Sequence, residues 1–298
     1  MHSSFHTISR PLLALAAAVG ILAAGAAAAS DSVLKLDAYN PGDKALFPVS
    51  SVLVTGKQDA ILVDAQFGRT QAEQVVEKIR ASGKKLVAVY ISHGDPDYYF
   101  GLDTIKAAYP DVKILATPQT VAHIKETVAQ KLAFWSPKLG ADAPTQTIVP
   151  DVLDGNTLTL EGKKLQVIGL DGPQPERSFV WIPSIGAVVG GVVVNGSEHI
   201  WMADTQGAQS HKDWLGTLAR IEKLKPRIVI PGHYAAGAPM TIASVKYTRD
   251  YIKAFDAETA KAVDSTALIA AMKARYPAPT NLSVLELSAK VAKGEIKW

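Results

Sequence analysis

Residues 91–101 read ISHGDPDYYFG, and this stretch is the most informative part of the chain. It closes an apolar, β-branched run, 85–92, that is typical of a strand. His93, Asp95 and Asp97 then stand at alternate positions in the loop after that strand. Loops at the carboxyl ends of strands are where α/β sheets place their ligands. Three side chains able to bind one ion, so close in sequence, make this loop the candidate site.

A second histidine also follows a predicted strand. The strand 227–230 runs into Pro231 and Gly232, and His233 comes next. Because His93 and His233 both stand at strand ends, we expect them to meet in space.

The first half of the chain alternates strands and helices. The runs 50–54 and 60–64 fit a hairpin around the turn GKQD at 56–59. The segment 70–82 has apolar residues at helical spacing and stops at Gly83. Helices are also expected at 98–109 and 119–134, on either side of a strand at 113–116. This alternation is typical of βαβ units with parallel strands.

The second half begins with a meander of antiparallel strands. These strands are expected at 157–160, 164–168, 178–182 and 187–189, before a helix at 211–224 and a helical tail from Thr241. Two β-rich layers, each followed by helices, predict an α/β fold of the four-layer αββα sandwich type in one domain. The loop 136–151, rich in Pro, Gly and Ala, is expected to be a mobile flap.

Residues 1–29 have the pattern of a signal peptide. Arg10 precedes an apolar core, 12–24, and Ala27-Ala28-Ala29 suits signal peptidase. An uncleaved anchor is the alternative, but the core is shorter than the roughly 20 apolar residues that a spanning helix needs. The mature domain is then 30–298, and we expect it to be periplasmic or secreted.

The composition narrows the possible partners. The chain has no cysteine, so neither disulfides nor thiolate ligands are available to it. Its formal net charge is only +3, with no concentrated basic stretch. We therefore expect a small-molecule substrate, no nucleic-acid partner, and no stable membrane contact after cleavage of the signal peptide.

The stretch 91–101 resembles the H-x-H-x-D-H motif of the metallo-β-lactamase superfamily. Asp64, which closes the strand 60–64, matches the family's buried structural acid, and Gly190-Gly191 stands where the family has Gly-Asp. His233 matches the last ligand histidine. The resemblance covers nearly the whole mature chain and implies the αββα fold of that family and a metallohydrolase.

The family's ligand set is only partly present. His93, Asp97 and His233 are kept, whereas Asp95 replaces a histidine. Three further ligand positions are altered: Tyr98 replaces a histidine, Gly191 replaces the bridging acid, and the loop 169–177 has no histidine. The resemblance therefore implies a single divalent ion, Zn, Fe or Mn, held by His93, Asp95, Asp97 and His233, with Asp97 also orienting the nucleophile.

Other side chains near these loops leave alternatives open. Tyr98, His199 and Asp204 are possible accessory ligands, although His199 also fits a structural histidine. Asp97 also fits a plain helix N-cap, which would need no metal. His123 and His211 are expected to be solvated on helix faces. Phe134 and Trp135 either line a pocket or pack in the core.

Two functions follow from these observations. The first is a hydrolase in which a metal-bound hydroxide attacks a small ester, thioester, lactone or amide. The second is a catalytically inactive protein of the same fold that binds a small ligand in the same cleft. A serine hydrolase finds no support, because the sequence has no Gly-x-Ser-x-Gly elbow.

Overall fold

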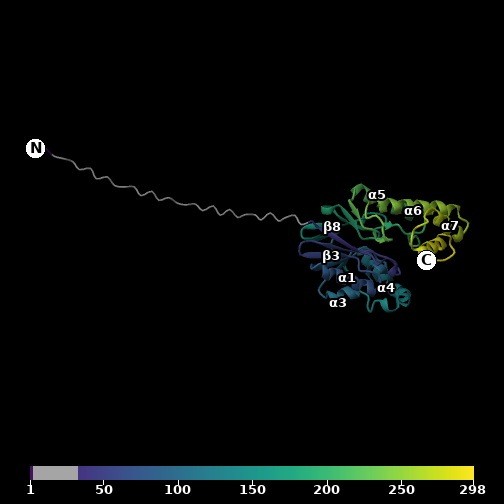
Figure 1. Cartoon of the computed structure of the whole chain (residues 1–298), viewed down its shortest axis with the longest axis horizontal. Helices are drawn as coiled ribbons and strands as arrows, with labels where there is room; N and C mark the ends of the chain where they lie inside the picture. Colours follow the sequence, from purple (N-terminus) through teal and green to yellow (C-terminus); the bar gives the residue numbers. More distant parts are fainter. Residues whose placement is uncertain (3–32) are drawn as a thin grey trace. The chain divides into compact units, whose positions relative to one another are not determined.

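Two β-sheets lie face to face in residues 33–298, which the computed structural model describes together with Met1 and His2 (Figure 1). The predicted signal peptide, 1–29, lies outside the described residues apart from its first two. Six strands form the first sheet in the order of the chain: β1 (Lys35–Tyr39), β2 (Ser51–Thr55), β3 (Asp59–Val63), β4 (Lys85–Ile91), β5 (Lys113–Ala116) and β6 (Asp151–Val152). β1 to β3 are antiparallel, and β3 to β6 are parallel, so the predicted hairpin and βαβ units are both confirmed.

The second sheet is mainly the predicted antiparallel meander. Its order is β12-β10-β9-β8-β7, with β7 at Thr157–Leu160, β8 at Lys163–Ile168, β9 at Phe179–Ile182, β10 at Ala187–Val189 and β12 at Ile228–Val229. A separate pair of short parallel strands, β11 (Asn195–Gly196) and β13 (His233–Tyr234), places Asn195 opposite His233. This pair was not expected from sequence.

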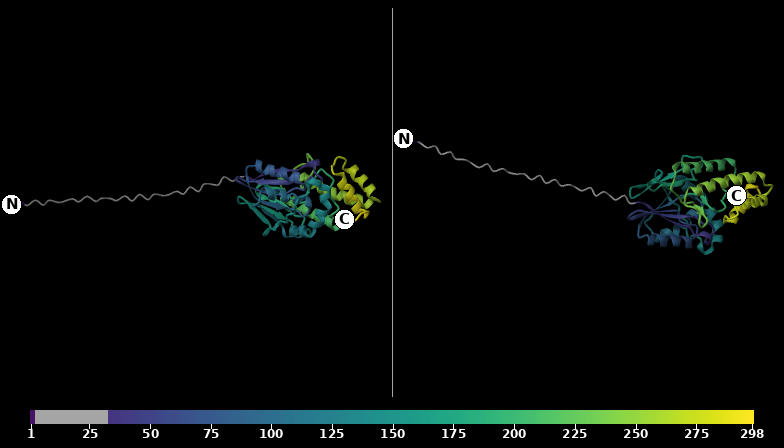
Figure 2. Two further views of the ribbon diagram at one scale, coloured as in Figure 1. Left: turned by 90° about the horizontal axis from the view of Figure 1, so that it is seen from below. Right: turned by 45° about the horizontal axis from the view of Figure 1, so that its top comes forward.

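Helices cover the outer face of each sheet (Figures 1 and 2). The first sheet carries α1 (Arg69–Ala81), α2 (Pro96–Tyr99), α3 (Leu102–Ala108) and α4 (Pro118–Leu139), and the second carries α5 (Ala208–Leu224) and α6 (Ile242–Lys261). Helix α7 (Ser265–Arg275) packs against α6, and α8 (Leu282–Ala292) packs against α7. Short 3-10 turns lie at Gly42–Lys44, Gly140–Asp142 and Pro183–Ile185. The predicted four-layer sandwich and helical tail are therefore confirmed. None of the helices in 33–298 is long and apolar enough to cross a membrane.

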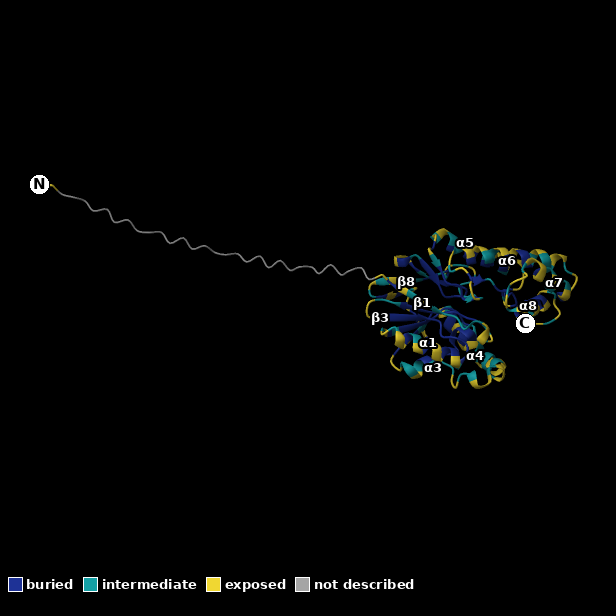
Figure 3. Ribbon diagram, viewed as in Figure 1, coloured by how far each residue is buried: buried dark blue, intermediate teal, exposed yellow. Residues whose placement is uncertain are grey.

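The period-2 pattern of the strands explains how the sheets stack. Ile61 and Val63 of β3 point toward Leu165 and Val167 of β8 and are buried in one apolar cluster between the sheets. Alternate residues of the same strands, such as Leu62, face the helices instead. In Figure 3 the central strands of both sheets are buried, while the outer faces of the helices are exposed.

Two boundaries near the site differ from the expectation. The helix predicted at 98–109 is two helices, α2 and α3, which meet around Gly101; a Cβ there would lie 2.1 Å from the carbonyl oxygen of Ala65. Helix α4 continues to Leu139, so the predicted flap was placed wrongly at its start. The segment after α4 is tied down, because Thr145 N–H donates to Asp103 (2.8 Å).

Candidate functional site

A cavity of about 890 Å³ opens beside the loop that follows β4. His93, Asp95 and Asp97 line it from that loop and from α2. Lys131 lines it from α4, and His233 lines it from the start of β13. The cavity wall is completed by the loop before β9, the segment after β11, the start of α8 and the last two residues of the chain. The structure thus brings both strand-end histidines to one cavity, as the sequence indicated.

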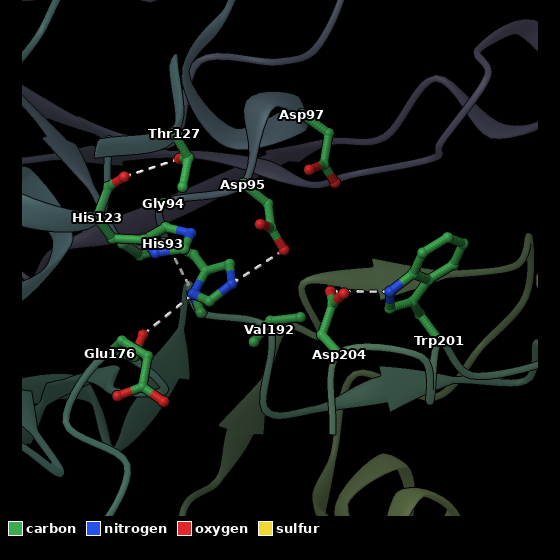
Figure 4. A network of polar contacts seen from close by, with 12 residues as sticks. His93, Gly94, Asp95, Asp97, His123, Thr127, Glu176, Val192, Trp201 and Asp204 are labelled. Carbon is green, nitrogen blue, oxygen red and sulfur yellow. Dashed lines mark hydrogen bonds and ion pairs between the residues drawn. The ribbon is translucent and has the colours of Figure 1, made fainter. Parts of the chain in front are cut away.

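Asp95 lies between His93 and Lys131, and Figure 4 shows its contact with His93. One carboxylate oxygen is 3.1 Å from His93 Nε2, and the other accepts a hydrogen bond from Lys131 Nζ at 2.9 Å. The second ring nitrogen of His93, Nδ1, lies 3.0 Å from the backbone carbonyl of Glu176. Because both nitrogens of His93 face acceptors, this arrangement suits an imidazolium.

The charges of this group support one another. Burial disfavours the imidazolium of His93, but Asp95 outweighs burial and raises the pKa of His93 above its usual value. Burial also opposes the carboxylate of Asp95, yet His93 and Lys131 hold the pKa of Asp95 well below its usual range. Asp95 is therefore an ionised carboxylate at neutral pH.

Lys131 is the residue that sequence reasoning missed in this group. Its Nζ donates to the carbonyl of Gly94 and lies near His123 Nε2, both at 3.0 Å. Burial and then the charge of Lys131 lower the pKa of His123, so this histidine is a neutral acceptor. His123 is half-buried and its ring fills the space above Gly94, where a Cβ would be 2.5 Å from His123 Cδ2. The expectation of a solvated His123 was wrong.

Asp97 and His233 form a second pair, with 3.1 Å between Asp97 Oδ2 and His233 Nε2. Burial disfavours the charged form of His233, but the hydrogen bond and charge of Asp97 outweigh it and raise the pKa of His233. The N-cap of α2 is Asp95, so the reading of Asp97 as an N-cap was wrong.

The ring of Tyr98 stands between the two pairs. Its centroid is 5.3 Å from that of His93 and 5.6 Å from that of His233, with edge-on geometry to both. Tyr98 is fully buried, and its hydroxyl has no hydrogen-bond partner among the described residues. Burial raises the pKa of Tyr98 well above its usual value, so it remains a neutral phenol.

Beneath the site, Asp64 holds the loop through Ser92. Asp64 takes a left-handed backbone conformation (φ 66°) and accepts hydrogen bonds from Ser92 N–H (2.8 Å) and Ser92 Oγ (2.6 Å). Ser92 Oγ in turn accepts from Gly191 N–H at 2.7 Å. A Cβ on Gly191 would lie only 2.1 Å from the carbonyl oxygen of Ser178, so this backbone has no room for an aspartate at position 191.

Two of the accessory candidates, His199 and Asp204, are hydrogen-bonded within the protein. His199 Nδ1 hydrogen-bonds with Tyr251 Oη at 3.0 Å, and burial lowers the pKa of His199 to about 4, as suits a structural histidine. Asp204 accepts from the indole of Trp201 at 2.8 Å and from the indole of Trp298. His211, expected to be solvated, is buried and bonded to Asp256. Phe134 and Trp135 both line the cavity.

Glu198 is a further cavity residue that the sequence did not single out. It is buried and accepts a hydrogen bond from Asn281 Nδ2 at 2.7 Å. Burial raises the pKa of Glu198 to about 7, although the positive charge of His233 partly offsets this. Its place just after β11, which pairs with β13, brings it toward His233. No sequence motif points to Glu198, because Asn281 and His233, which influence its carboxylate, belong to elements distant in sequence.

The comparisons with known proteins define the class. The model of the metallo-beta-lactamase superfamily matches residues 45–233, more than half of the chain. The chain therefore belongs to the metallo-beta-lactamase superfamily, whose members are mostly hydrolases and typically depend on metal. A curated relative, the atrochrysone carboxyl ACP thioesterase of Aspergillus fumigatus, is 22% identical over 207 residues. That match covers 69% of this chain but only 57% of the relative.

Solved structures confirm the fold. The DIM-1 metallo-beta-lactamase is 21% identical, with a TM-score of 0.53 over 74% of this chain and 93% of that one. TMB-1 is 18% identical, with a TM-score of 0.50 over 74% of this chain and 92% of that one. At these identities the likeness concerns the α/β fold alone.

The donors of this site, as arranged, do not fit the family's metal. No group of three or more His, Asp or Glu side chains in 33–298 is placed to hold a metal ion. The four predicted ligands form two His–Asp pairs, and the ring of Tyr98 lies between the two histidines. The ammonium of Lys131 already supplies a positive charge to Asp95, where a second cation would be repelled.

Proposed function

We propose that this protein hydrolyses a small ester or thioester in the cavity, with its own side chains moving the protons. Membership of a mostly hydrolytic family supports this proposal, and the thioesterase name of the curated relative favours an acyl substrate. The observation that carries it is that Glu198, whose pKa is about 7, lines the same cavity as the Asp97–His233 pair. A carboxyl group that titrates near neutral pH is suited to act as both base and acid.

Glu198 is the proton carrier in this proposal. As a carboxylate it takes a proton from water while the water oxygen forms a bond to the carbonyl carbon of the substrate. When the tetrahedral intermediate collapses, the bond from that carbon to the leaving oxygen or sulfur breaks, and Glu198 returns the proton to the leaving group. The products are a carboxylic acid and an alcohol or thiol. Burial and the hydrogen bond from Asn281 fix one end of Glu198 for this task.

His233 and Asp97 provide the electrostatic part. Asp97 favours the protonated form of His233, which lines the cavity. In this proposal the imidazolium faces the negative charge that develops on the carbonyl oxygen. Fixed charges that face a developing oxyanion in a partly dry site are an effective form of catalysis. Asp97 thus acts as a positioning residue for His233.

Steady-state hydrolysis of 4-nitrophenyl phenylacetate and of a phenylacetyl thioester tests this proposal. Glu198→Gln keeps the shape of the side chain, and we expect it to lower kcat by about 100-fold or more. Because Glu198 must be deprotonated to act as a base, kcat/KM of the wild type should rise with pH through about 7. The exposed Glu286→Gln is the matched control and should leave the rate unchanged. A Glu198→Gln rate within threefold of wild type would contradict the proposal.

The metal-dependent reaction expected from the sequence is tested by the same assay. We expect dialysis against a chelator to leave the rate unchanged, because the proposed steps use side chains only. If activity is lost and then restored by Zn, Fe or Mn, the metal-dependent reaction is correct and the Glu198 route is wrong.

A ligand-binding protein without turnover is the second candidate. It is favoured by Lys131, which pairs with Asp95 in the motif that carries metal ligands elsewhere in the family. Saturable ligand binding with no turnover of either substrate would support this candidate. For either function, the segment 1–29 supports our proposal that the protein works in the periplasm or outside the cell on a small molecule, without nucleic acid or stable membrane contact.

A further inference from the structure

Arg177 is a buried cation, and two of its guanidinium nitrogens have no acceptor among the described residues. It is only 6% exposed, yet its Nε and Nη2 have no hydrogen-bond partner in the described part of the chain. The residue lines the cavity from the loop before β9. A buried guanidinium without partners is costly, because burial removes water that would otherwise bond it.

The nearby acids do not satisfy this guanidinium. Asp95 is bonded to His93 and Lys131, and Asp204 is bonded to two indoles. Neither forms an ion pair with Arg177 among the described residues, although the charges of both partly offset the effect of burial, which lowers the pKa of Arg177. The positive charge is thus partly balanced at a distance, while the N–H groups remain available.

Arg177 is held in a fixed orientation. Its guanidinium lies 4.2 Å from the centroid of the Trp214 ring, and the indole of Trp214 donates to the carbonyl of Val193 at 2.8 Å. The backbone N–H of Arg177 donates to Gln174 O at 3.0 Å, which closes the loop behind it. Stacking on an aromatic face leaves the edge of a planar guanidinium free to donate two parallel hydrogen bonds.

Five aromatic rings form another part of the cavity wall. Trp135 contacts Phe47 and Phe134, with ring centroids 5.3 and 4.8 Å apart. Trp201 contacts Trp298 at 5.0 Å and Phe47 at 5.9 Å. All five rings line the cavity, and Phe134 and Trp298 are nearly half exposed. Rings of this kind provide flat apolar surfaces for a planar ligand.

We propose that Arg177 binds the carboxylate of a small ligand whose flat apolar body lies among these aromatic rings. The guanidinium fork matches a carboxylate in shape and charge, and the match supplies the acceptors that Nε and Nη2 lack. This inference rests on the proposed function, because it names the substrate class of the same cavity: an acyl compound that also carries a free carboxylate.

Calorimetric titration of the whole protein with 2-naphthoate and with the neutral 2-naphthamide tests this inference. The two probes share a ring system and differ in charge. We expect wild type to bind 2-naphthoate at least about 30-fold more tightly, as is typical for a desolvated charge pair. Arg177→Gln should lower the affinity for 2-naphthoate by a similar factor and change the affinity for 2-naphthamide by less than about threefold.

Two further variants keep the test decisive. Arg220→Gln removes an exposed arginine that pairs with Asp171 and should leave both affinities unchanged. Arg177→Lys keeps the charge without the fork and should weaken 2-naphthoate by at least about fivefold, which answers the question if Arg177→Gln fails to fold. Equal binding of the two probes by wild type, or undiminished 2-naphthoate binding by both Arg177 variants, overturns the inference. Tighter binding of 2-naphthyl phosphate than of 2-naphthoate overturns the assignment to a carboxylate.

The two proposals fail separately. If Glu198→Gln abolishes hydrolysis of the phenylacetate ester while the Arg177 variants still bind 2-naphthoate, only the carboxylate inference is wrong. If 2-naphthoate binding depends on Arg177 but no substrate is turned over, only the proposed hydrolysis is wrong.

Discussion

Replacing Lys131 with methionine tests the interpretation of the site most directly. Methionine retains the apolar length of the side chain and removes the ammonium, so Asp95 keeps His93 as its only cationic partner. Gly94 O and His123 Nε2 lose their contact with Nζ as well. We expect lower stability together with a higher pKa of Asp95.

The size of the effect follows from burial. The Lys131 and Asp95 side chains are 19% and 26% exposed, so the pair is neither a surface ion pair nor a fully dry one. Removing one partner of a buried pair costs about 3 to 5 kcal/mol, and an exposed pair contributes at most about 1 kcal/mol. We therefore expect Lys131→Met to lower the free energy of unfolding by about 2 to 3 kcal/mol.

Urea denaturation measures this change. With a slope of about 2 to 3 kcal/mol per molar urea, the midpoint should fall by about 1 M. Lys125→Met is the matched control, because Lys125 is exposed on the same helix and should give no change. The double variant with Asp95→Asn should lose about 1 to 2 kcal/mol less than the sum of the single changes.

Zinc provides the result that would refute this reasoning. If Lys131 occupies the place of a cation, excess Zn²⁺ should not raise the midpoint of the wild type. A zinc-dependent rise would mean that the His and Asp side chains rearrange around metal, since an ion that binds only the folded state stabilises it. A decrease in the urea midpoint of less than about 0.2 M for Lys131→Met would equally refute it, because the ion pair would then contribute almost nothing to stability.

Three other variants should give clear results by urea denaturation. Gly191→Asp, which restores the family's acid, should lower the free energy of unfolding by more than about 3 kcal/mol, because φ is 80° and a Cβ would lie 2.1 Å from Ser178 O. Gly216→Asp is the control, because a Cβ there meets open space, and it should lower the free energy of unfolding by less than about 1 kcal/mol. Tyr98→Phe removes a buried hydroxyl that has no partner within 33–298, and it should be neutral or stabilising by about 1 kcal/mol. A loss of stability above about 1 kcal/mol would reveal a bond to the hydroxyl. Glu198 keeps its proton up to about pH 7 in the folded protein but loses it near 4.5 in the unfolded chain, so the free energy of unfolding should fall by up to about 3 kcal/mol as pH rises across that window. Glu198→Gln should remove this part of the pH dependence. An identical pH dependence in both proteins would contradict the raised pKa of Glu198.

The sequence predicted the fold well because the strands carry simple apolar patterns. The bounds of β5, β7 and β10 agree to the residue, and those of β3 and β8 within one residue. Of the four two-residue strands in 33–298, β12 lies in the predicted run 227–230, whereas β6, β11 and β13 have no pattern to recognise. Their pairing depends on loops that come together only in the folded chain.

The candidate site was predicted only where a motif marks it. His93, Asp97 and His233 lie at one cavity, since strand ends dictate their positions. Lys131, Arg177 and Glu198 were missed because each is an ordinary polar residue until tertiary contacts bury it. The position of Phe134 and Trp135 beside the predicted flap gave a hint of a wider pocket.

The parallel pairing of β11 with β13 has a mechanical consequence. Gly232 N–H donates to Val194 O at 3.0 Å and Ala235 N–H donates to Gly196 O at 2.9 Å, so backbone hydrogen bonds join two segments that are distant in sequence. Glu198 follows one segment and His233 begins the other. We therefore expect a displacement of either segment to be transmitted to the other, so that Glu198 and His233 would keep their relative positions.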